Sequence, residues 1–152
     1  MIQGDGGHAA VIRELIDAAG KDLTGSVVIA VGDNTARKKE AERLGEAYEF
    51  AEPLIHPSAV VSKSAVIGLG TVVMAGAVIQ TGAVVGKHCI INTCASVDHH
   101  CVIGDYVHIA PGVHLCGGVE VGEGAIVGVG SCAVPGAKIP RWSLVKAGSV
   151  VS

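Results

Sequence analysis

Aliphatic residues recur every six positions through the last two thirds of the chain. Residues 55–150 divide into 16 consecutive hexads without an insertion, and the first position of 15 of them is Ile, Val or Leu. Ala133 occupies that position in the remaining hexad, and the fifth position is always Ala, Thr, Cys, Ser or Val. A period of six matches neither an amphipathic helix nor an alternating strand. The pattern therefore indicates a repeat architecture.

The hexads predict a three-sided β-solenoid. Each hexad supplies one short strand and one corner, with its first and fifth side chains directed into a narrow interior. Three hexads complete a coil, so residues 18 positions apart stack at the strand spacing of about 4.8 Å. Burying each stacked aliphatic side chain contributes roughly 1.5–3 kcal/mol, and the entropy of ordering the chain offsets most of it. We expect a mainly-β domain of a little over five coils across residues 54–152.

The first third of the chain follows a different pattern. Residues 1–54 carry 16 of the 25 charged residues, whereas residues 55–152 carry nine. This shift favours a small α/β unit, a shortened Rossmann-like fold, over residues 1–53. Too few residues precede Gly4 for a first strand. The expected elements are a helix over 8–19 stopped by Gly20, a strand over 26–31, a helix N-capped by Asn34 that runs to Leu44, and a strand over 48–50.

Composition excludes several classes of protein. The chain is 49% hydrophobic and 16% charged, which argues against disorder, and its net charge of −3 argues against a nucleic-acid binder. Residues 64–86 carry no charge, but their glycines and six-residue period argue against a membrane span. Five cysteines without zinc-site spacing, and no signal peptide at the start, favour a reducing cytoplasm and no bound metal.

Histidines are the most informative polar residues of the repeat region. Six of the seven lie there, and the densest group is Asp98, His99 and His100. His108 follows His99 by nine residues, which is half of an 18-residue coil. The two rings therefore cannot stack in one chain. They could converge in a crevice between neighbouring chains of a trimer.

The repeat resembles the hexapeptide-repeat family, whose members form left-handed parallel β-helices and usually trimers. A closer resemblance, spanning nearly the whole chain, is to the sugar O- and N-acetyltransferases of the bacillosamine, perosamine and sialic-acid type. The segments that carry it are Gly4-Asp5-Gly6-Gly7-His8, the strand from Val27 to Asn34, Leu54-Ile55-His56-Pro57-Ser58-Ala59, Ile91-Asn92-Thr93, Val97-Asp98-His99, and His108-Ile109-Ala110-Pro111-Gly112.

This resemblance implies an enzyme that transfers acetyl from acetyl-CoA to an amino group or hydroxyl of a nucleotide-linked sugar. His99 matches the general base, and a base with a pKa near neutral suits direct attack on an activated thioester. Asp98 and His100 flank that base. The resemblance also implies contacts with the acetyl group and the coenzyme by His108, Gly117, Val129 and Ala147, of which Gly117 suits a hydrogen bond to the oxyanion. It implies contacts with the nucleotide by Gly6, Gly7, His8 and Gly32.

Three departures from that family are visible. His100 occupies the position where an orienting acid commonly follows the catalytic histidine. The segment between Gly20 and Ser26 is too short for the family's second strand and its Asp-containing turn, and the sequence ends before a Pro-Ala-containing tail. The other functions considered are a non-catalytic scaffold, a serine O-acetyltransferase and a γ-type carbonic anhydrase. The histidine spacings of 11, 9 and 6 residues from His88 to His114 fit the last poorly.

Overall fold

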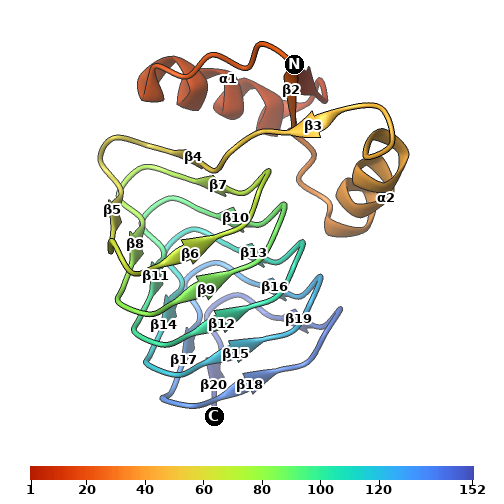
Figure 1. Ribbon diagram of the computed structural model, residues 1–152. Coiled ribbons are helices and arrows are strands. Elements are labelled where there is room, and N and C mark those ends of the chain that lie inside the picture. The colour runs from red at the N-terminus through yellow and green to blue at the C-terminus, as the bar shows by residue number, and fades with distance from the viewer.

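A three-sided β-solenoid forms most of the molecule, with two helices packed beside its first coils (Figure 1). The computed structural model describes residues 1–152. From Leu54 onward the chain forms a two-residue strand every six residues, and each strand pairs in parallel with the strands 18 residues away. The predicted period and coil length are therefore confirmed.

The strands form three sheets of six, six and five strands, here called face 1, face 2 and face 3. Face 1 contains β4 (Leu54–Ile55), β7 (Val72–Val73), β10 (Ile90–Ile91), β13 (His108–Ile109), β16 (Ile126–Val127) and β19 (Leu144–Val145). Face 2 contains β5 (Val60–Val61), β8 (Val78–Ile79), β11 (Ser96–Val97), β14 (His114–Leu115), β17 (Cys132–Ala133) and β20 (Val150–Val151). Face 3 contains β6 (Val66–Ile67), β9 (Val84–Val85), β12 (Val102–Ile103), β15 (Glu120–Val121) and β18 (Lys138–Ile139).

Two-residue corners join the faces. Corner 1–2 contains residues 57–58, 75–76, 93–94, 111–112, 129–130 and 147–148. Corner 2–3 contains residues 63–64, 81–82, 99–100, 117–118 and 135–136, and corner 3–1 contains residues 69–70, 87–88, 105–106, 123–124 and 141–142. The second corner residue often has a positive φ, which glycine adopts without strain. His100 adopts it too, with φ 58°, and its ring lies over Gly82 of the preceding coil.

The interior of the solenoid is the aliphatic core that the hexads predicted. The second residue of each strand points inward, and Val73, Ile91, Val97 and Ile109 have no exposed surface. Fifth-position residues such as Ala95 fill the space between them, in a single cluster of 23 buried side chains. Because each coil repeats the last, residues 18 apart in sequence become neighbours.

The N-terminal unit is a parallel three-stranded sheet with two helices. The sheet order is β1 (Ile2–Gln3), β2 (Ser26–Ile29), β3 (Glu49–Phe50), so a short first strand exists where too little room was expected. Helix α1 (Gly7–Ala19) ends at Gly20, whose φ of 61° confirms the predicted stop. Helix α2 (Asn34–Leu44) is N-capped by Asp33, which accepts a bond from Ala36 N–H, and not by Asn34 as expected. Neither helix has the length and apolarity needed to cross a bilayer.

Both helices dock on the solenoid. Helix α1 packs on face 1, where Ile12 and Leu15 join Leu54, Val72 and Ile90 in a second buried cluster. Helix α2 lies against corner 3–1. Asn34 Nδ2 donates to the carbonyl oxygens of residues 124 and 125 at 3.1 Å each, so its side chain joins α2 to the solenoid. The two docking contacts fix the N-terminal unit against the first four coils.

Arg37 is the most buried contact between α2 and the solenoid, with 1% of its surface exposed. Its guanidinium donates to the carbonyl oxygens of Val31, Gly32, His88 and Tyr106 at 2.8–3.0 Å. The oxygen of the Asn34 side chain accepts a further bond at 2.7 Å. No carboxylate is bonded to the guanidinium, and burial lowers the Arg37 pKa to about 10. Arg37 therefore holds a β-strand end, a helix and two solenoid coils together.

Candidate functional site

His99 lies at corner 2–3, directly against the backbone of the next coil. The backbone N–H of Gly118 donates to the His99 carbonyl at 2.9 Å, so residues 99–100 and 117–118 are stacked neighbours. A Cβ atom at Gly117 would overlap the His99 ring. The structure therefore brings together a histidine ring and a glycine backbone, and both residues were predicted site residues. Glycine at position 117 gives the ring its space.

His100 and Asp98 hold His99 in different ways. The Nδ1 atoms of His99 and His100 lie 3.0 Å apart, with the two rings nearly perpendicular at 78°. Asp98 Oδ1 instead accepts the backbone N–H of His99 at 2.7 Å, so it fixes the corner and not the ring. One of the two Nδ1 atoms donates its hydrogen to the other. When His99 is the donor, its Nε2 is the nitrogen without hydrogen, and the His100 ring is the hydrogen-bond acceptor.

His108 lies on face 1, in a separate part of the surface. Its Nε2 is 3.1 Å from Asn92 Nδ2. Asn92 Oδ1 accepts the Thr93 N–H at 2.8 Å, which identifies the Asn92 nitrogen as the donor to His108. Burial first, and then the charges of Arg37 and His8, lower the His108 pKa to about 4. His108 is therefore a neutral ring with Nδ1–H.

The two histidines do not meet within one chain. Corner 2–3 is the solenoid edge opposite face 1, so His99 and His108 are on opposite sides of the prism. The nine-residue spacing predicted this separation. The ring of His108 leans toward Asn92, which lies beside corner 1–2. The two edges that carry candidate chemistry, corner 2–3 and corner 1–2, are the two borders of face 2.

The N-terminal unit forms a pocket from the four residues predicted to hold a nucleotide. Gly6, Gly7, His8 and Gly32 line a depression of about 320 Å³ at the carboxyl end of β2, together with Gly4, Asp5, Ala30 and Val31. Gly6 caps α1 without a side chain, so the first N–H groups of that helix are open to a ligand. Burial and the charge of Arg37 lower the His8 pKa, and its Nε2 is buried without a partner. This geometry suits an anionic group at the helix N-terminus.

Val129 and Ala147, the predicted coenzyme contacts, are exposed on corner 1–2. They occupy the same corner position in successive coils. Lys146 lies beside them, whereas Arg141 and Trp142 lie on corner 3–1. The Lys38 ammonium sits 5.3 Å from the Trp142 ring centroid and pairs with Glu123 at 2.7 Å, so Trp142 is engaged by α2.

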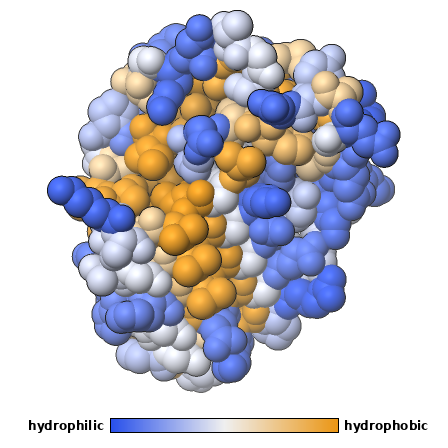
Figure 2. Space-filling view, viewed as in Figure 1, coloured by the Kyte–Doolittle hydropathy of each residue, from blue (hydrophilic) through white to orange (hydrophobic).

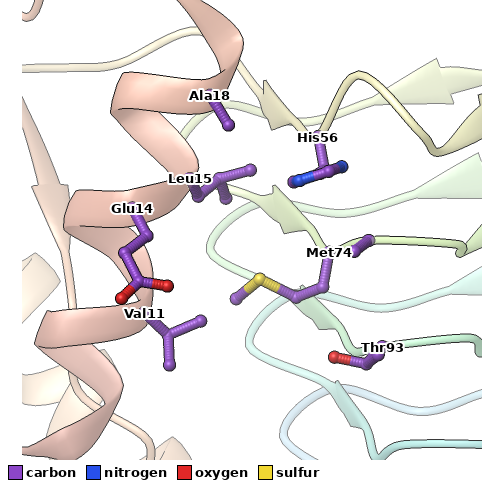
Figure 3. Close-up of a pocket in the computed structure, with 8 residues that line it drawn as sticks. Val11, Glu14, Leu15, Ala18, His56, Met74 and Thr93 are labelled. Carbon is purple, nitrogen blue, oxygen red and sulfur yellow. The ribbon is translucent and has the colours of Figure 1, made fainter.

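A groove that the sequence did not predict lies between α1 and corner 1–2 (Figure 3). It has a volume of about 270 Å³. In Figure 3 the Met74 side chain extends from the solenoid toward α1, between His56 and Thr93. Its lining consists of Val11, Glu14, Leu15, Ala18, His56, Met74, Ala75 and Thr93.

The five cysteines differ in burial. All five are free, and Cys89 and Cys101 are buried in the solenoid interior. Burial raises the pKa of the Cys89 thiol to about 12, which keeps it protonated. Cys89 and Cys101 are therefore packing residues of the solenoid interior, whereas Cys94 is exposed at corner 1–2 and Cys116 and Cys132 are partly buried.

Comparisons with known proteins agree with this arrangement. Residues 100–134 match the family model described as bacterial transferase hexapeptide (six repeats). The acetyltransferase domain of PglB from Neisseria gonorrhoeae is 34% identical, with a TM-score of 0.93, and the match covers 99% of this chain and 89% of that one. PerB from Caulobacter crescentus, solved with CoA and GDP-perosamine, is 37% identical, with a TM-score of 0.94 and coverage of 99% and 87%.

A match at higher identity is shorter. The UDP-N-acetylbacillosamine N-acetyltransferase of Bacillus subtilis is 46% identical over 96 residues, which covers 44% of that protein. The chain thus matches less than half the length of that relative. The PglB domain has also been solved with acetyl coenzyme A, and the Caulobacter perosamine enzyme as histidine mutants.

Proposed function

The chain belongs to the hexapeptide-repeat acetyltransferases related to the PglB domain and PerB, and we propose that it acetylates the amino group of a nucleotide-linked sugar with acetyl-CoA. The observation that carries the proposal is the His99 ring held against the Gly117 backbone. It pairs a base with a backbone N–H donor at one corner, which is what acyl transfer from a thioester requires.

His99 is the general base. The sugar amine attacks the thioester carbonyl carbon and loses a proton to His99 Nε2, while His100 accepts the Nδ1–H of His99 and keeps the ring aligned. The carbonyl oxygen becomes an oxyanion and accepts a hydrogen bond from the Gly117 N–H. The C–S bond then breaks, the amide is complete, and the proton held by His99 is available to the departing CoA thiolate. Asp98 holds the corner through the His99 backbone.

His108 supplies the other side of the site. As a neutral ring fixed by Asn92, it presents a stable surface to the acetyl group. Val129 and Ala147 flank the pantetheine arm along corner 1–2. Because His99 and His108 lie on opposite sides of one prism, we assign them to two adjacent chains of a homotrimer, with corner 2–3 of one chain against corner 1–2 of the next.

Residues 1–53 act as the nucleotide-sugar unit and residues 54–152 as the acyltransferase unit. Gly6, Gly7, His8 and Gly32 surround the nucleotide diphosphate, and the open N-terminus of α1 favours its charge. The five free thiols fit the reducing cytoplasm, where acetyl-CoA is available. We expect the residues around this pocket to determine which nucleobase and which sugar the protein binds.

Calorimetric titration with acetyl-CoA tests the proposal first. We expect micromolar binding near one site per chain, and acetylation of at least one member of a panel of UDP-, GDP- and dTDP-linked amino sugars. His99→Ala is expected to lower kcat by about 100-fold or more with binding retained. His114→Ala, which removes another exposed histidine, is the matched control. A folded, trimeric protein that binds no acetyl-CoA would rule the proposal out.

A further inference from the structure

The groove between α1 and corner 1–2 has a largely apolar floor. Leu15 and Met74 are 3% exposed and belong to the cluster that joins α1 to face 1. Val11, Ala18 and Ala75 complete the apolar lining, while Glu14 and His56 lie among the lining residues as its ionisable groups. His56 Nδ1 is bonded to Ser58, through both the N–H and the hydroxyl of that residue. The groove therefore suits a short hydrocarbon chain and not a phosphate.

The groove lies in line with the proposed path of the coenzyme. Ala75, Thr93, Pro111, Val129 and Ala147 occupy one corner position in successive coils. Backbone hydrogen bonds link every pair of successive coils at this corner. Each of the carbonyls of Ala75, Thr93, Pro111 and Val129 accepts from the N–H of the residue 19 positions further along the chain, at 2.8–3.1 Å. Each coil adds about 4.8 Å, so the groove at Thr93 and Ala75 begins about two coils beyond Val129.

The adjacent column on face 1 carries small residues between these points. Ala110 and Gly128 have small side chains or none, and Lys146 stands at the far end of the column. Their strands are paired in register through His108 and Ile126. Asn92, whose amide binds His108, is the residue before Thr93 at the mouth of the groove. An extended acyl-pantetheine chain laid along this corner passes the His108–Asn92 pair and enters the groove.

We propose that this groove is an acyl pocket, and that the protein accepts thioesters with acyl chains of about four carbons in addition to acetyl. The inference rests on the proposed function, because it uses the coenzyme path along Val129 and Ala147. The transfer step is unchanged: the amine nitrogen bonds to the acyl carbon, the C–S bond breaks, and the proton passes through His99. Only the part of the acyl chain beyond the carbonyl differs, and it lies against Met74 and Ala75.

Binding of a thioester series tests this without knowledge of the sugar. Acetyl-, propionyl-, butyryl- and hexanoyl-CoA are titrated into the wild-type protein by calorimetry. Each methylene buried in an apolar pocket contributes about 0.8 kcal/mol, which is about a fourfold change in Kd. We expect the Kd to fall by about this factor per carbon from acetyl to butyryl. A Kd that stays level or rises along the series overturns the acyl pocket while the acetyltransferase assignment stands. Absence of binding by every thioester overturns both.

A pair of matched substitutions locates the effect. Ala75→Phe fills the groove, and Leu69→Phe places the same side chain at the equivalent position of corner 3–1, away from it. We expect Ala75→Phe to raise the ratio of the butyryl-CoA Kd to the acetyl-CoA Kd at least tenfold, and Leu69→Phe to leave the ratio unchanged. Thermal unfolding and gel filtration confirm that both variants fold and assemble. A ratio that is the same in Ala75→Phe as in wild type means that the groove holds something else, such as a substituent of the sugar, and refutes the inference.

Discussion

His88 links the stability of the N-terminal docking surface to pH. Its ring is 2% exposed at corner 3–1, stacked on Tyr106 with centroids 5.3 Å apart and edge-on to Phe50 at 4.4 Å. Its Nδ1 is buried without a hydrogen-bond partner, and its carbonyl oxygen accepts from Arg37. Adding a proton to this ring places a second cation near the buried guanidinium. His88→Phe keeps an aromatic ring in the slot and removes the titrating group.

The magnitude follows from the pKa of the folded state. Burial, and then the charge of Arg37, lower the His88 pKa to about 4, against about 6.5 in the unfolded chain. Since the unfolded state binds the proton more tightly, the stability contributed by the neutral ring is complete above pH 6.5 and declines as pH falls toward 4. The titration of His88 should therefore lower the free energy of unfolding by about 1 kcal/mol at pH 5.5 and by about 3 kcal/mol at pH 4, relative to its value above pH 7.

Urea unfolding at fixed chain concentration between pH 7.5 and pH 4 measures the effect. Wild type and His88→Phe are expected to differ little in unfolding free energy at pH 7.5, and the variant is expected to retain more of it at pH 4. The pKa of His108 is lowered in the same direction, so a residual acid dependence remains in the variant. If both proteins lose the same free energy from pH 7.5 to pH 4, the buried ring of His88 does not control acid sensitivity and the reasoning is wrong.

Two further substitutions test the site and its support. Gly117→Ala adds a Cβ that overlaps the His99 ring, so kcat should fall by about 100-fold or more with unfolding temperature nearly unchanged. Gly118→Ala has open space at its Cβ but a φ of 70°, so it should lower the unfolding temperature and yet retain far more activity in the same assay. Arg37→Lys leaves several buried carbonyl groups without donors and should lower the free energy of unfolding by at least about 3 kcal/mol. Arg43→Lys, at an exposed pair with Glu40, should leave the urea midpoint unchanged, and an equal loss in both arginine variants would contradict the role given to Arg37.

The solenoid could be predicted from the sequence because its order is nearly one-dimensional. Each hexad specifies its own strand, corner and inward side chains, and each coil contacts only its neighbours. The same register accounts for two features of the site. Gly117 follows His99 by 18 residues and lies against it, while His108 follows by nine and lies on the far side. Neither relation depends on a contact outside the repeat.

The N-terminal unit was less predictable because its details depend on docking. Asn34 has a good capping side chain, and local sequence alone favours it as the N-cap. In the structure its amide reaches the carbonyls of residues 124 and 125, some 90 residues away, and Asp33 takes the cap. A long-range bond to buried carbonyls thus determined which of two adjacent residues capped the helix. The two-residue strand β1 likewise exists because β2 is there to pair with it.

An exposed apolar column on face 3 bears on how the chains associate. Val66, Val84 and Val102 form an exposed column on face 3 that is 43–60% accessible, and an apolar band follows these strands in Figure 2. Below it the column continues as Glu120 and Lys138, which pair at 3.1 Å. The proposed catalysis by His99 and His108 needs contact across the borders of face 2, and the face 3 column lies next to one of those borders. Covering this column would also bury apolar surface, so both considerations favour association of the prisms side by side.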